Sequence, residues 1–163
     1  MRRMHLAVAV AAATGLLLAM IGTVVARDAS DSQTARDRVH FAVLTGVKEV
    51  DAEGTRGTGD PNGRGSFSAT LDGTTLCYGI QVKNIATPVA AHIHRGIRSV
   101  AGPIEVPLEH PASGDPGASS DCVEITSAQA QALRLNPGRF YVNVHTADFP
   151  AGAVRGQLFP RVR

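Results

Sequence analysis

The stretch Val89-Ala90-Ala91-His92-Ile93-His94-Arg95-Gly96 is a short apolar run that ends in two histidines at alternate positions. Alternate residues of a β-strand share one face of a sheet. We therefore expect a strand from Val89 to His94 with Val89, Ala91 and Ile93 directed toward the core. His92 and His94, together with Ala90, would lie on the other side.

A second run, Phe140-Tyr141-Val142-Asn143-Val144-His145, shows the same alternation. It predicts a strand whose inward residues are Phe140, Val142 and Val144. Tyr141 and Asn143 would share the opposite face with His145. That face either lines a shallow site or is an ordinary exposed strand face.

The clearest local signal is a β-hairpin over residues 66–82. Residues 66–71 and 76–82 both alternate between apolar and polar side chains, and Asp72-Gly73 between them is a favoured hairpin turn. The residues expected to face inward are Phe67, Ala69, Leu71, Leu76, Tyr78, Ile80 and Val82, with Cys77 on the opposite face.

Further strands are predicted at residues 40–50, 104–108 and 153–159. Ile104, Val106 and Leu108 would face inward, and Pro107 favours an edge position because proline cannot donate a ladder hydrogen bond. Residues 109–121, rich in Pro, Gly, Ser and Ala, predict an exposed loop.

One short helix is predicted over residues 126–135, capped by Thr126 or Ser127 and stopped by Asn136-Pro137-Gly138. About seven short strands and a single helix do not fit a parallel α/β fold. They predict an all-β protein, an antiparallel, Greek-key-like β-sandwich.

Residues 1–26 predict a targeting segment. Arg2 and Arg3 precede an uncharged, largely apolar run from Leu6 to Val25, and Val24 and Ala26 suit a cleavage site. The run is also long enough to span a bilayer, so a retained N-terminal membrane anchor is the alternative. We favour cleavage. Either interpretation places a flexible lead-in (27–39) and the domain (40–160) outside the cytoplasm. The protein would be secreted, or it would be anchored in the membrane by residues 6–25.

Composition limits the partners. Apart from Arg2 and Arg3, the chain carries 14 basic and 14 acidic residues. Without a basic surplus, a nucleic-acid partner is not expected. Cys77 and Cys122, an even number in an exported domain, predict one disulfide bond, with two buried free thiols as the alternative.

Four segments carry a family resemblance, and they occur in a fixed order. They are Gly-Asp-Pro-Asn-Gly-Arg-Gly (59–65), Leu-Cys-Tyr-Gly-Ile (76–80), Ala-Ala-His-Ile-His-Arg-Gly (90–96) and Tyr-Val-Asn-Val-His-Thr-Ala-Asp-Phe-Pro-Ala-Gly-Ala-Val-Arg-Gly-Gln-Leu (141–158). Together they resemble the CHRD domain, named after chordin, over residues 40–159. The resemblance implies an extracytoplasmic β-sandwich, which occurs alone in bacteria and repeated in chordin, an extracellular binder of bone morphogenetic proteins. It implies no established catalytic activity.

The histidines suggest a metal site. Neutral imidazoles from two neighbouring strands, His92, His94 and His145, suit copper or zinc, and His110 is a weaker candidate for a fourth ligand. The arrangement resembles Cu/Zn superoxide dismutase, and Gly152-Ala153-Val154-Arg155 is loosely similar to the segment with that enzyme's anion-guiding arginine. The chain departs from that enzyme in having no bridging histidine and no His/Asp set for zinc.

The alternative is a polar network. In it the three histidines hydrogen-bond to Asn143, Thr146, Asp148 or the backbone, while Arg95 and Arg155 pair with Asp148 or Glu105. Arg155 would then be a surface or structural ion-pair residue.

Two hypotheses of function follow. The first is an exported, non-enzymatic binding or structural module of the CHRD type, with an unknown extracellular or cell-envelope ligand. The second is a copper- or zinc-binding metalloprotein with a histidine cluster like that of superoxide dismutase, acting in redox or superoxide chemistry. Tyr141, Asn143 and Arg155 are additional candidates to line its site.

Overall fold

A computed structural model describes residues 39–160 of the chain. The predicted targeting segment and nearly all of the predicted lead-in lie outside these residues. The strands are β1 (Val39–Thr45), β2 (Arg64–Asp72), β3 (Thr75–Lys83), β4 (Pro88–Arg95), β5 (Ile104–Leu108), β6 (Gly117–Glu124), β7 (Phe140–Thr146), β8 (Val154–Gln157) and β9 (Phe159–Pro160). The helical elements are α2 (Ser127–Leu135) and the 3-10 turns η1 (Gly46–Lys48) and η2 (Pro137–Arg139).

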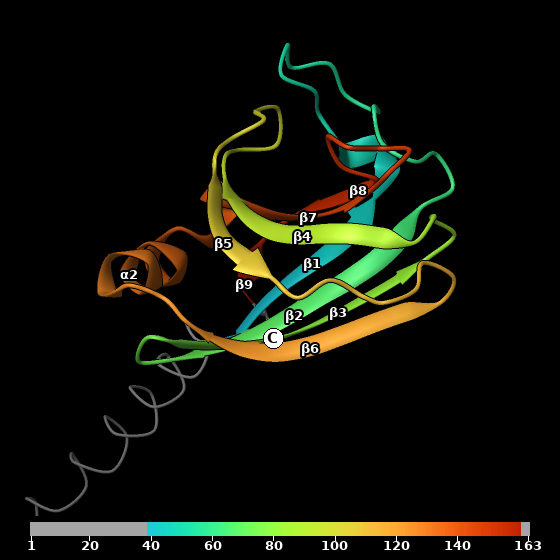
Figure 1. Cartoon of the computed structure of the whole chain (residues 1–163). Helices are drawn as coiled ribbons and strands as arrows, with labels where there is room; N and C mark the ends of the chain where they lie inside the picture. The colour runs from blue at the N-terminus through green and yellow to red at the C-terminus, as the bar shows by residue number, and fades with distance from the viewer. Residues whose placement is uncertain (1–38, 161–163) are drawn as a thin grey trace, which may run out of the picture.

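The strands form one strongly curved antiparallel sheet that nearly closes on itself (Figure 1). Their order is β5-β4-β7-β8-β1-β2-β3-β6, and β9 pairs with β1. Every pair is antiparallel. The predicted all-β, antiparallel sandwich with one short helix is therefore confirmed.

The predicted hairpin is β2–β3, in which Asp72 lies opposite Thr75. Gly73 has a φ of 58°, in the left-handed region that glycine adopts without strain. All seven residues expected to face inward from this hairpin are buried in one core cluster. The predicted helix is α2, whose Thr126 and Gln129 form a reciprocal capping box. Arg134 of α2 donates to the carbonyl oxygen of Gly73 at 2.6 Å, which holds the helix beside the hairpin turn.

Two inward predictions were wrong because β-bulges change the register. Val89 is 56% exposed, and the pairing of β4 with β7 shifts between Pro88 and Ala90. Ile104 is 54% exposed, and the pairing of β4 with β5 shifts beside His94. A bulge adds one residue to a strand and so interrupts the alternation of its side chains. A period of two that is extended through the bulge therefore assigns the residues beyond it to the wrong face.

The predicted exposed loop over residues 109–121 was also wrong in part, because β6 begins at Gly117. β6 pairs with β3 over eight residues, and most of its side chains are exposed. As the outermost strand on that side of the sheet, it needs few apolar residues, so its sequence looks like a loop. The predicted strand over 153–159 is divided into β8 and β9, and the predicted strand over 40–50 ends at Thr45.

β7 is buried on both faces, although an exposed face was one alternative. Its inward residues join the core, while Tyr141 and Asn143 on the other side are only 2% and 1% exposed. The loop after β4 covers this outer face. Tyr141 accepts a hydrogen bond from Gly102 N at 3.1 Å, and Arg155 donates to the carbonyl oxygens of Ile97 and Val100 at 2.9 Å. The fold therefore has a second, polar layer outside the barrel wall.

Candidate functional site

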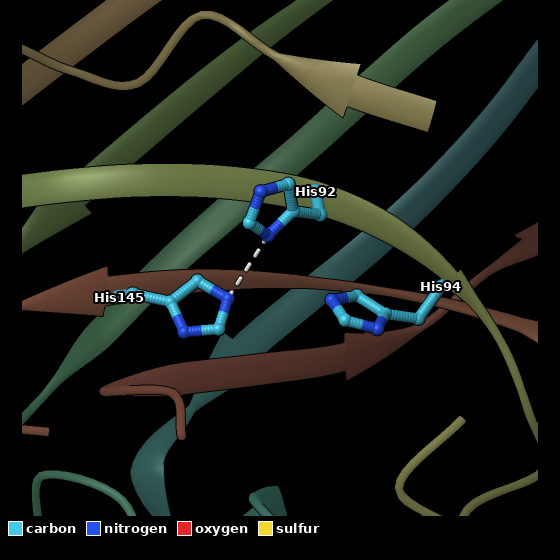
Figure 2. A group of neighbouring side chains, drawn as sticks. All are labelled: His92, His94 and His145. Atoms are coloured by element: carbon cyan, nitrogen blue, oxygen red, sulfur yellow. Dashed lines mark hydrogen bonds between the residues drawn. The ribbon is translucent and has the colours of Figure 1, made fainter. Parts of the chain in front are cut away.

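Three imidazoles meet within this polar outer layer. β4 and β7 are neighbours in a register that places Ala90 opposite His145 and His94 opposite Tyr141. His92, His94 and His145 all lie on the outer face of this strand pair, and Figure 2 shows their rings turned toward one another. The sequence prediction that these three histidines share one site agrees with this placement.

The ring nitrogens lie close enough to act on one ligand. His92 Nδ1 and His145 Nε2 are 3.1 Å apart, and one nitrogen from each of the three rings lies within 4.8 Å of the other two. His94 and His145 are buried, and His92 is half-buried. Among residues 39–160 this is the single group of three or more His, Cys, Asp or Glu side chains with metal-binding spacing.

Backbone carbonyls set the tautomers of two of the rings. His94 Nδ1 lies 2.8 Å from the carbonyl oxygen of Gly102, and His145 Nδ1 lies 3.0 Å from that of Pro150. A carbonyl oxygen only accepts, so both Nδ1 atoms carry the proton and both Nε2 atoms keep a lone pair in the neutral rings. His94 Nε2 is buried and has no hydrogen-bond partner among the described residues.

Asn143 adds an oxygen to this cluster. Its amide nitrogen donates to the carbonyl oxygen of Ala151 at 3.4 Å, and its Oδ1 lies 3.0 Å from His145 Nε2. Lone pairs of His94, His145 and Asn143 therefore converge, and the Nδ1–H of His92 is the donor available to His145. The three acceptors therefore lack a shared donor among the side chains of the cluster.

Burial keeps the rings neutral. Burial, followed by the neighbouring His145 and His94, lowers the pKa of His92 to about 4. Burial also lowers the pKa of His94 and of His145, against the opposing effect of their carbonyl hydrogen bonds. The three imidazoles therefore bind an additional proton only weakly near neutral pH. The neutral imidazole is the form that ligates a metal.

Tyr141 and Arg155 support the cluster from one side. The Tyr141 ring stacks on His94 with 4.8 Å between centroids, and the Arg155 guanidinium carbon lies 3.3 Å from the Tyr141 ring centroid. Arg155 was expected to be a surface or structural ion-pair residue, with Asp148 or Glu105 as partner. It is a buried structural ion-pair residue, but its partner is Glu49 at 3.7 Å rather than either of these carboxylates. Arg95, in contrast, forms the expected pair with Glu105 at 2.7 Å.

Glu49 is the residue that sequence reasoning missed. It is 1% exposed, and burial raises its pKa, although the Val50 amide and the Arg155 charge act in the opposite direction. Nothing in Lys48-Glu49-Val50 distinguishes this carboxylate from a surface glutamate. His110, the weaker candidate ligand, lies outside the histidine group and contacts the carbonyl oxygen of Pro111.

The family model of the CHRD domain matches residues 40–158. The chain belongs to the CHRD domain family. A comparison with curated proteins found no match, and a comparison with solved structures found none either. CHRD domains are typically extracellular. Within residues 39–160, this CHRD domain has no helix long and apolar enough to cross a membrane.

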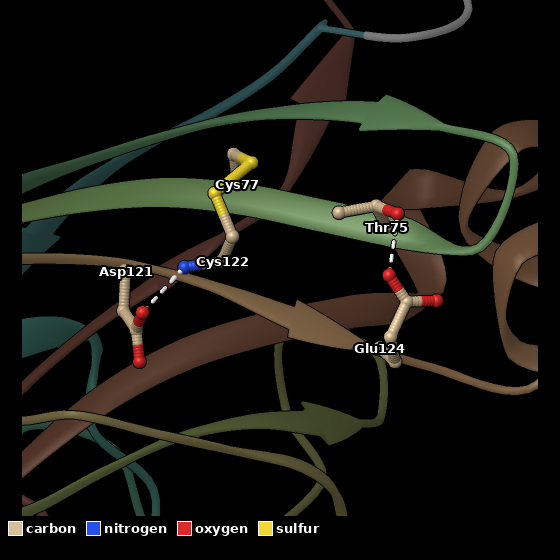
Figure 3. The surroundings of a disulfide bond; sticks show 5 residues. All are labelled: Thr75, Cys77, Asp121, Cys122 and Glu124. Atoms are coloured by element: carbon tan, nitrogen blue, oxygen red, sulfur yellow. Dashed lines mark hydrogen bonds between the residues drawn. A yellow bond between two sulfur atoms is a disulfide. The ribbon is translucent and has the colours of Figure 1, made fainter.

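The cysteines of the CHRD domain form the predicted disulfide bond. Cys77 of β3 and Cys122 of β6 lie directly opposite in the ladder, with Cα atoms 4.0 Å apart and an S–S distance of 2.07 Å (Figure 3). The bond crosslinks an outermost strand to its neighbour. Because β6 contributes little to the core, this covalent link compensates for weak packing.

Proposed function

We propose that this CHRD domain is a binding or structural module that acts outside the cytoplasm and has no catalytic activity of its own. Its extracellular or cell-envelope ligand is unknown. Membership of the CHRD family carries the proposal. The disulfide supports it, because such bonds persist in oxidising compartments and are rare in the cytosol.

Cell fractionation followed by N-terminal sequencing tests this proposal. The protein is expected in the periplasmic, surface or secreted fraction, with its cysteines protected from alkylation until a reductant is added. A mature N-terminus near Arg27 would support signal cleavage, and an intact leader in the membrane fraction would support the anchor. Recovery in the cytosol with free thiols would refute the proposal.

A second candidate function is copper or zinc binding by the histidine group. The observation that favours it is the convergence of three imidazoles whose burial disfavours a proton. His94 Nε2 and His145 Nε2 would be ligands, and His92 would join after moving its proton to Nε2. The carbonyl oxygens of Gly102 and Pro150 would orient two ligand rings, as outer-sphere partners do in metalloproteins.

This candidate is a single-ion site. A two-metal centre like that of superoxide dismutase needs a second set of His or Asp ligands, and residues 39–160 contain one suitable group. Imidazole ligands suit both zinc and copper. A copper ion would add redox chemistry, whereas zinc would serve binding or structure alone.

Metal content and calorimetric titration with copper or zinc distinguish the module from the metalloprotein. The purified protein is expected to bind one ion, and His92→Ala is expected to abolish binding because one of three ligands is lost. His110→Ala is the matched control, since His110 lies outside the group. Full binding by the His92→Ala variant, or no binding by the wild-type protein, would refute the metal site and leave the module proposal standing.

A further inference from the structure

A second site lies on the outer face of β1 and β8. It is a cavity of about 140 Å³ lined by four cationic side chains, Lys48, Arg56, Arg98 and Arg155, and by no carboxylate. In a chain whose described domain has no basic surplus, four cations around one small cavity are a local concentration of positive charge. It contains none of the three histidines, although Arg155 also contacts Tyr141 beside that group.

The fold gathers these cations from four separate segments. Lys48 ends η1, Arg56 lies in the loop between β1 and β2, Arg98 lies in the loop between β4 and β5, and Arg155 lies on β8. The two loops extend from the same end of the barrel (Figure 1). Arg155 is fixed within the wall of the cavity by its two bonds to backbone carbonyls, whereas Arg56 and Arg98 are exposed.

The four charges act against one another. The pKa of Lys48 is lowered by burial and then by the charge of Arg98, and that of Arg155 is lowered chiefly by burial, with Arg56 adding to the effect. Arg155 has Glu49 as a distant ion-pair partner at 3.7 Å. Within residues 39–160, Lys48, Arg56 and Arg98 form no salt bridge. An anion in the cavity would relieve this repulsion.

The remaining wall consists of two apolar side chains, Val43 and Phe159, and the amide side chain of Gln157. Val43 is 55% exposed and Phe159 is 45% exposed, and both line the cavity. These two side chains give the cavity an apolar surface directly beside its cationic part. A ligand that fits both parts of the wall carries an anionic head and an apolar body.

We propose that this cavity binds an organic phosphate, with its phosphoryl oxygens on Lys48, Arg56, Arg98 and Arg155 and its apolar part on Val43 and Phe159. Guanidinium groups suit phosphate because their donors match its oxygens two at a time. A doubly charged head also offsets more of the repulsion than a carboxylate does. The site gives the binding module a ligand class that does not depend on the metal site.

Calorimetric titration with phenyl phosphate at low ionic strength tests the proposal, with inorganic phosphate as the second probe. Wild-type protein is expected to bind phenyl phosphate more tightly than inorganic phosphate. Arg98→Gln and Arg56→Gln are each expected to weaken binding of both probes by about tenfold or more, the effect of losing one charge-assisted contact. Phe159→Ala is expected to weaken the binding of phenyl phosphate and to leave the binding of inorganic phosphate unchanged.

Arg134→Gln is the matched control, because Arg134 lies on α2 beside the β2–β3 turn and does not line the cavity. It removes the same charge and is expected to leave both affinities unchanged. Equal losses of affinity in Arg134→Gln and Arg98→Gln would show that the probes are held by non-specific charge attraction, and would refute the site. Absence of phenyl phosphate binding at millimolar concentration, or unchanged affinity in both Arg56→Gln and Arg98→Gln, would refute it as well.

Discussion

The half-buried His92 makes the metal-free domain sensitive to acid. Burial, with smaller effects of His145 and His94, lowers its pKa to about 4, whereas an exposed imidazole has an ordinary value of 6.5. Between these two pH values the unfolded chain binds a proton at this position that the folded chain does not bind. Stability is therefore complete above pH 6.5 and falls as the pH decreases toward 4.

The size of the loss follows from the two pKa values. Each pH unit between them corresponds to 1.36 kcal/mol, so the interval of about 2.5 pH units gives at most about 3.4 kcal/mol. Because His92 is only half-buried, water screens part of this effect, and we expect a loss of about 1–2 kcal/mol. The neighbouring His94 and His145, whose pKa values burial also lowers, add to the wild-type loss.

Urea unfolding at pH 7.0 and at pH 4.5, with a chelator present, measures this loss. The difference in unfolding free energy between the two pH values is expected to be smaller by about 1–2 kcal/mol in His92→Asn than in the wild-type protein. Carboxylate titration contributes equally to both proteins and cancels in the comparison. His110→Asn is the control and should keep the wild-type difference. If His92→Asn keeps it too, the neutral buried imidazole is not the source of acid sensitivity.

Two further predictions concern stability at neutral pH. Replacing both Cys77 and Cys122 by Ser opens a loop with a sequence separation of 45, which should lower the unfolding free energy by about 2–4 kcal/mol. Denaturant unfolding of the variant, compared with wild-type protein in the absence of reductant, checks this, and equal midpoints would contradict it. Gly152→Ala should destabilise by about 2 kcal/mol or more, because Gly152 has a φ of 141° and its Cβ would collide with the Glu49 carboxylate. Gly138→Ala, where a Cβ meets nothing within 4 Å, is the control in a thermal unfolding assay, and similar losses in the two variants would contradict the reasoning.

The polar outer layer explains why His94, His145 and the Arg155–Glu49 pair are buried. Loops folded over β7 and β8 supply carbonyl oxygens to His94, His145 and Arg155. Each of these side chains therefore has at least one partner that does not depend on solvent. A polar layer held in this way fixes ring orientation before any ligand arrives, which is the condition for a preorganised site.

The sequence by itself determined the features that depend on local order. Alternation over residues 66–82 specified the β2–β3 hairpin and its inward face, and Thr126 with Asn136-Pro137-Gly138 specified the limits of α2. The period of two also placed His92 with His94, and Tyr141 with Asn143 and His145, on common faces. These features are local because side-chain direction repeats along a strand whatever its partners are.

The tertiary structure alone decided which faces are covered. Two bulges turned Val89 and Ile104 outward, and pairing with β3 made a strand of the polar segment Gly117–Glu124. The loop after β4 buried Tyr141 and brought Arg98 beside Lys48, and the turn after β1 carried Glu49 to Arg155. Alternation identifies the residues that share a face, but contacts between segments far apart in the chain determine whether that face meets water. The His92–His94–His145 group could therefore be predicted as a set, while its burial, its tautomers and its neighbouring charges required the folded chain.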